Sequence, residues 1–116
     1  MPQLLITPDY YKNLFSRWTN DIAMLPDFPT EAKEKLVALH FIMLAFADGE
    51  EYSEDDIHEG IKDRNLFSID HVQIRINMVR NGFLAKIEKE PGSFYKTSKE
   101  FLKHAQWDSS IPGVTL

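Results

Sequence analysis

The residues that could carry chemistry gather first in an acidic stretch. Seven acidic side chains stand within twelve positions, around His58: Asp48, Glu50, Glu51, Glu54, Asp55, Asp56 and Glu59. An EF-hand calcium loop that began at Asp48 would need Gly at its sixth position, which is Ser53 here. Glu54 and His58, four positions apart, could share a divalent metal, but no other histidine stands at ligand spacing. We therefore expect no metal site and a solvated helix start, where the helix dipole favours carboxylates.

The other polar residues form no catalytic constellation. The four histidines are scattered along the chain, and there is no cysteine. No serine or aspartate stands at a recognisable nucleophile spacing from them. The five glycines are isolated and form no phosphate-binding loop. We expect no enzymatic activity and no cofactor.

Charge is distributed unevenly along the chain. The net charge is −5, yet residues 1–70 carry −8 and residues 71–103 carry +4. A basic segment on an acidic protein is the pattern expected for phosphate binding. A mixed, solvated surface is the alternative, because four net charges are few.

Composition limits the class of protein. A chain of 116 residues with 43% hydrophobic residues is one domain with a small core. The absence of cysteine excludes disulfides and fits a cytoplasmic protein. No apolar run approaches the ~20 residues that span a bilayer, so we expect no membrane partner. The N-terminus lacks the basic and apolar regions of a signal peptide.

Two helices are predicted in the first part of the chain. Thr7-Pro8-Asp9 is a typical helix start, and one apolar stripe follows it: Tyr11, Phe15, Trp18, Ile22 and Leu25. We expect this stripe to pack on the next helix or on a second copy, so Tyr11, Phe15 and Trp18 are candidate partner-interface residues. Thr30 is the expected cap of the next helix, in which His40 is the only polar residue between Leu36 and Ala47. A helix so apolar must be central.

Two shorter helices and a β-hairpin are predicted next. Ser53 caps the first helix, and the second begins near Ser68 or Asp70 and ends at Asn81-Gly82. Strands are expected at 83–88 and 94–97, joined by a type II turn with Pro91-Gly92 at its centre. A short strand at 51–52 could pair with the hairpin. Thr97 and Glu100 form a predicted capping box for a last short helix.

This order is that of a winged-helix domain. We therefore predict a mainly α fold with a small β-hairpin (α+β), a winged-helix domain with an added N-terminal helix. Its predicted parts are the N-terminal helix extension at 1–27, the winged-helix domain at 28–107 and a tail at 108–116.

The second of these helices is the one that would enter a DNA groove. The candidate nucleic-acid contacts on it and on the hairpin are Gln73, Arg75, Asn77, Arg80, Lys86, Lys89 and Lys96. Ile74 and Met78 share the expected core face. Val72 and Ile76 would be exposed in a simple DNA-binding arrangement, so they are candidate partner-interface residues.

Several segments resemble an uncharacterised bacterial winged-helix-like family. They lie between about residues 28 and 97, and include the family's Tyr-Ser/Thr-Glu signature at Tyr52, Ser53 and Glu54. The family's Leu-Arg-Arg run is met by Ile74 and Arg75 but not by Ile76. Members of the family occur alone or fused behind helix-turn-helix transcriptional regulators. The resemblance implies an association with transcription and no established activity.

Two functions are compatible with these observations. The first is a transcription-associated module, a regulator that binds double-stranded DNA as a dimer, which the +4 segment favours. The second is a protein-interaction or ligand-sensing module that has this fold without binding DNA. Val72 and Ile76 favour the second, because they are apolar where a DNA-binding helix would be exposed.

Overall fold

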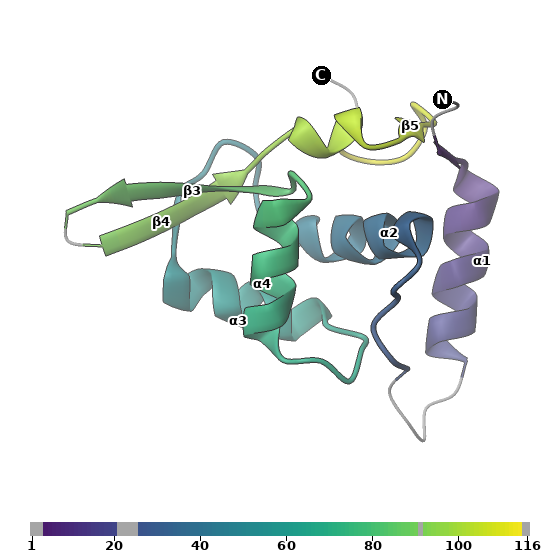
Figure 1. The fold of residues 1–116 in the computed structure, drawn as a ribbon, viewed down its shortest axis with the longest axis horizontal. Helices are drawn as coiled ribbons and strands as arrows, with labels where there is room; N and C mark the ends of the chain where they lie inside the picture. Colours follow the sequence, from purple (N-terminus) through teal and green to yellow (C-terminus); the bar gives the residue numbers. More distant parts are fainter. Residues whose placement is uncertain (1–3, 21–25, 91, 115–116) are drawn as a thin grey trace.

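The computed structural model describes residues 4–20, 26–90 and 92–114. Figure 1 shows helix α2 across the middle of the molecule, α1 on one side of it, and α3, α4 and a projecting hairpin on the other. The elements are, in order, β1 (Leu5–Ile6), α1 (Pro8–Thr19), α2 (Ala32–Met43), β2 (Tyr52–Ser53), α3 (Glu54–Arg64), α4 (His71–Arg80), β3 (Leu84–Lys89), β4 (Gly92–Thr97), the 3-10 helix η1 (Glu100–Lys103) and β5 (Gln106–Trp107).

The strands form two small sheets. β2, β4 and β3 lie in that order in an antiparallel sheet, and β1 pairs with β5 in parallel. The predicted strand at 51–52 is thus confirmed as β2, which pairs Tyr52 with Tyr95. The predicted turn at Pro91-Gly92 falls partly on Pro91, which lies outside the described residues, and Gly92 itself begins β4.

Local capping signals explain where most helices begin and end. The hydroxyl oxygens of Thr7 and Ser53 each accept from the amide three residues later, at 3.2 Å. The Asp70 carboxylate accepts from the amide two residues later, at 2.7 Å. Gly82 follows α4 with a φ of 83°, and a Cβ there would lie 2.6 Å from the backbone nitrogen of Phe101. The predicted starts of α1, α3 and α4 and the predicted end of α4 are therefore confirmed.

Two other predicted caps are wrong. Glu31, not Thr30, caps α2, because its longer carboxylate accepts from two amides of the first turn, at 3.1 and 2.9 Å. Thr97 belongs to β4, and its hydroxyl donates to Asp48 at 2.8 Å. The capping box with Glu100 therefore does not form, and a short 3-10 helix follows.

α2 is the centre of the hydrophobic core, as predicted. Its buried side chains point in all directions around the helix: Leu36, Val37, Ala38, Leu39, His40, Ile42 and Met43. Ile57 and Ile61 of α3 and Ile74 and Met78 of α4 are fully buried against it and one another. Each such side chain contributes roughly 1.5–3 kcal/mol before entropy is subtracted. In the part of the chain that the structure describes, no helix is both long and apolar enough to cross a bilayer.

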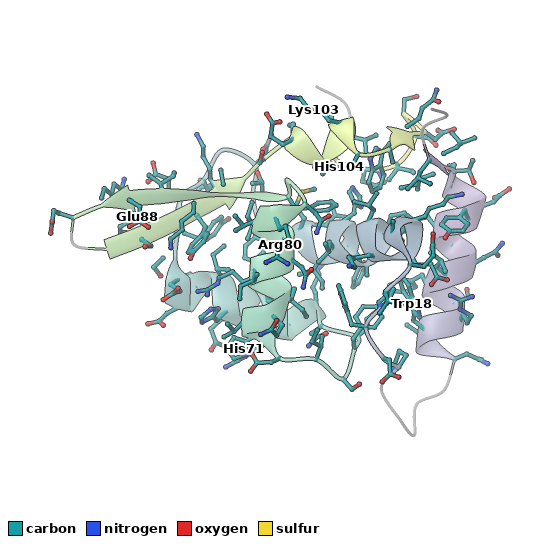
Figure 2. The ribbon with its side chains drawn as sticks, in the orientation of Figure 1. Trp18, His71, Arg80, Glu88, Lys103 and His104 are labelled. Carbon is teal, nitrogen blue, oxygen red and sulfur yellow. The ribbon has the colours of Figure 1, made fainter. Side chains whose placement is uncertain are left out.

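α1 packs on α2 within the same chain. The ring centroids of Phe15 and Phe41 lie 4.8 Å apart, and those of Trp18 and Phe67 lie 5.0 Å apart. Figure 2 shows Trp18 on the side of α1 that faces the rest of the molecule. Tyr11 joins this packing through His40. The apolar stripe was predicted to pack on the next helix or on a second copy, and the structure shows it packed on the next helix.

Tyr11, Phe15 and Trp18, which the sequence predicts as partner-interface residues, make intramolecular contacts with His40, Phe41 and Phe67. Their role in a partner interface stays a prediction. The buried Leu14, which the predicted stripe omits, completes this face of α1. Two predicted members of the stripe, Ile22 and Leu25, lie outside the described residues.

His40, a residue of α2, connects this helix to α1 and to the C-terminal segment. Its side chain is fully buried, and Tyr11 Oη lies 2.8 Å from its Nδ1. His40 Nε2 donates to the carbonyl oxygen of Pro112 at 2.8 Å, so Nδ1 accepts from the tyrosine hydroxyl. Within the predicted tail at 108–116, Ile111 and Val114 are also buried, while residues 115–116 lie outside the described part of the chain. The segment returns to the core because it satisfies a buried imidazole.

The stability of the protein should fall in mild acid because of His40. Burial lowers the pKa of His40 to about 4, from a usual value of 6.5. Between these two pKa values the unfolded chain therefore binds one more proton than the folded chain. The free energy of unfolding is highest above pH ~6.5 and decreases as the pH falls toward 4. We expect a loss of about 3 kcal/mol in the free energy of unfolding across this window, measured by urea denaturation.

A matched pair of variants isolates the effect. His40→Gln removes the titrating group and should flatten the profile between pH 6.5 and 4. His104→Gln changes an exposed histidine (Figure 2) and should leave the profile as in the wild type. An unchanged slope in His40→Gln would assign the acid sensitivity to other groups.

Candidate nucleic-acid interface

α4 has a buried face and an outward face. Ile74 and Met78 are fully buried, as predicted from their spacing. On the outward side, Gln73, Asn77 and Arg80 follow one another at spacings of four and three residues, so they share one flank of the helix. Figure 2 shows Arg80 on the outward side of α4. This polar flank contains three of the predicted nucleic-acid contacts.

The other flank of α4 borders a groove beside the β3–β4 hairpin. The groove encloses about 390 Å³ and is lined by Arg75, Ile76, Val79, Arg80, Lys86 and Tyr95. Lys86 and Tyr95 are cross-strand partners, which places their side chains on the same face of the sheet. Cationic and apolar side chains therefore line the groove together.

Two of the lining residues were not predicted as site residues. Tyr95 reaches the groove through the strand register, which the sequence alone does not reveal. Val79 is 37% exposed and shares the apolar flank with Ile76, so helical spacing could have identified it.

Arg75 is already engaged inside the chain. Its guanidinium forms an ion pair with Glu54, and its Nη1 lies 3.4 Å from Nε2 of His58. Its side chain is only 18% exposed. The guanidinium also lies 5.8 Å from the ring centroid of Tyr95. Arg75, predicted as a phosphate contact, thus connects α4 to α3 and to the sheet.

The neighbouring histidines belong to the same contact between α3 and α4. The ring centroids of His58 and His71 lie 4.6 Å apart. Because a guanidinium only donates, Nε2 of His58 accepts from Arg75 and carries no proton. Burial lowers the pKa of His58, and the charges of His71 and Arg75 lower it further. Nowhere in residues 4–20, 26–90 and 92–114 do three His, Cys, Asp or Glu side chains come together as metal ligands would.

The hairpin lysines are placed in three different ways. Lys86 reaches the groove and lies 3.2 Å from Glu88, in a pair that is exposed on both sides. Lys89 is held by Glu51, with Nζ 2.5 Å from the carboxylate. Lys96 follows Tyr95 in β4, so it points to the opposite face of the hairpin. Of the three, only Lys86 is brought to the groove.

The Tyr52-Ser53-Glu54 signature has a structural role at each position. The Tyr52 hydroxyl accepts from the amide of Ala47 at 2.8 Å, and Ser53 caps α3. Glu54 holds Arg75 and also accepts from Tyr95 Oη at 3.4 Å. The three residues thus position α3 and α4 against the sheet.

A comparison with known families matches residues 24–95 to a family described as an uncharacterized protein conserved in bacteria (DUF2087). The match covers more than half of the chain, and the chain belongs to this family. Comparisons with curated proteins and with solved structures give no match.

A double-mutant cycle should show that Arg75 and Glu54 are coupled. We expect Arg75→Gln and Glu54→Gln to destabilise the protein less in combination than the sum of their separate effects. The coupling should be about 0.5–1 kcal/mol, because the pair is only partly shielded from water. Urea denaturation of the four proteins measures it.

The exposed pair Lys62 and Glu59, 3.7 Å apart, serves as the matched control. Its cycle should give a smaller coupling, since both side chains are largely in water. Equal couplings in the two cycles would contradict the role of Arg75 in joining α3 to α4.

Proposed function

We propose that residues 28–107 form a winged-helix domain. The proposal is supported by the order helix α2, strand β2, helices α3 and α4, and hairpin β3–β4, with β4 between β2 and β3. α4 takes the place of the recognition helix and the hairpin takes the place of the wing. α1 and the C-terminal segment are additions that cover α2.

We propose further that this domain binds double-stranded DNA as part of transcriptional control. The observation that carries the proposal is the polar flank of Gln73, Asn77 and Arg80 on the outward side of α4, next to a groove that cations help to line. An α-helix fits the major groove, where amide and guanidinium side chains hydrogen-bond to base edges. Arg80 and Lys86, which both line the groove, would contact phosphates and orient α4.

The distribution of charge supports this placement. Most of the acidic excess lies in residues 1–70, outside α4 and the hairpin. Next to α4, Asp70 caps the helix and Glu54 neutralises Arg75, so both carboxylates are used within the protein. As a dimer, two such domains would place their α4 helices in successive major grooves about 34 Å apart.

DNA binding by the groove cations should weaken as salt rises. Arg80 and Lys86 imply two phosphate contacts and a log–log slope of about −1.8 between affinity and salt concentration. Arg80→Ala and Lys86→Ala should each reduce the slope by about 0.9. Fluorescence anisotropy of a labelled duplex, titrated between about 50 and 200 mM salt, measures the slope.

Lys96→Ala is the matched control, because it removes the same charge from the opposite face of the same hairpin. It should change the slope by less than half as much as Lys86→Ala. Equal effects of the two lysines would indicate nonspecific attraction, and absence of duplex binding at 50 mM salt would refute the proposed function.

The second candidate function is an interaction module that uses the same groove for a protein partner. Ile76 and Val79 favour it, since they present apolar side chains to solvent. Ile76→Asp should then reduce the oligomeric mass in light scattering, because a buried, unpaired carboxylate disrupts an interface. Unchanged mass and melting temperature together with lost DNA binding would exclude this candidate.

A further inference from the structure

Ile76 occupies the middle of the outward face of α4. On one side of it lie Gln73 and Asn77, and together with Arg80 it lines the groove beside the hairpin. Val72 precedes it by four residues, so the two side chains share a stripe along the helix. Both are partly exposed in the structure. An apolar stripe therefore lies where base edges would lie if α4 entered a major groove.

This stripe has no role in the core. Ile74 and Met78 already supply the buried face of α4. α1 packs on the far side of α2, away from the hairpin (Figure 1). Ile76 lines an open groove, and the described part of the chain covers it only in part.

We propose that Ile76 and Val72 contact the C5-methyl groups of thymine in the major groove. The inference rests on the proposed DNA binding and names the class of target, a duplex with A·T pairs beneath the first turns of α4. Thymine is the only base that offers a methyl group in this groove. Against the polar edges of the other bases, the two aliphatic side chains would remove water without returning a hydrogen bond.

The adjacent amide side chain is suited to the same base pairs. A glutamine can accept from N6 and donate to N7 of adenine in a bidentate arrangement. Gln73 is exposed, and it stands one position from Val72 and three from Ile76. Asn77 already donates its Nδ2 to the backbone oxygen of Gln73 at 2.8 Å, which leaves Gln73 as the better adenine partner. Aliphatic and amide side chains thus favour the two bases of one pair.

The test exchanges thymine for deoxyuridine, which lacks only the methyl group. Duplexes are first selected from a random library with the full-length wild-type chain. We then expect each contacted thymine that is replaced to weaken wild-type binding about fourfold, the effect of one methyl-sized group removed from water. In Ile76→Ala the same replacement should have no effect at the thymine that Ile76 contacts, while the salt slope stays unchanged.

Val79→Ala is the matched control, because it shortens an apolar side chain at the far end of α4. It should retain the full sensitivity to deoxyuridine. Circular dichroism melts of each variant establish that it is folded, and the base exchange on the wild-type protein needs no variant at all. Wild-type binding that is indifferent to deoxyuridine, or sensitivity that persists in both Ile76→Ala and Val72→Ala, would overturn this inference and leave the proposed DNA binding intact. Absence of any selected duplex would overturn both.

Discussion

The packing of α1 and of the C-terminal segment on α2 depends on the two hydrogen bonds of one buried side chain, the imidazole of His40. It lies within the central helix, where an unsatisfied polar group would cost about 1–3 kcal/mol. Tyr11 from the N-terminal helix and the Pro112 carbonyl from the C-terminal segment satisfy its two nitrogens. Each ring nitrogen has one hydrogen-bond partner, so the neutral imidazole holds α1 and the C-terminal segment on α2. α2 is thereby covered on the sides that α3 and α4 leave open.

A second contact sets the position of α4. Glu54 begins α3 and holds Arg75 of α4, while Tyr95 from β4 donates to the same carboxylate. Tyr52, Ser53 and Glu54 therefore have a role in packing. By using Arg75 internally, the protein determines which cations remain available on the outward side. Arg80 and Lys86 remain at the groove, and this is why the proposed phosphate contacts are fewer than the basic segment suggests.

The outward face of α4 is neither a simple polar face nor a simple apolar one. Gln73 lies on one flank, and Ile76 lines the groove together with Arg80. The partial exposure of Ile76, taken by itself, favours a protein partner. In the proposed DNA complex, thymine methyl groups would give the same residue a role in binding, because a major groove presents apolar as well as polar atoms. In the first explanation a protein partner covers Ile76, and in the second a DNA duplex covers it.

Sequence by itself determined the four helices and the β-hairpin, but not the pairing of β1 with β5. A cap such as Ser53 or Asp70 needs only amides two or three residues away, so these helix starts were predictable, and apolar periodicity alone placed α2 at the centre. The residues of α4 in the candidate site followed from the same spacing. Only the tertiary structure decided that Arg75 is neutralised, that Tyr95 lines the groove and that the segment 108–114 returns to α2. Those contacts join residues far apart in the chain, and they depend on strand register and on how the helices pack.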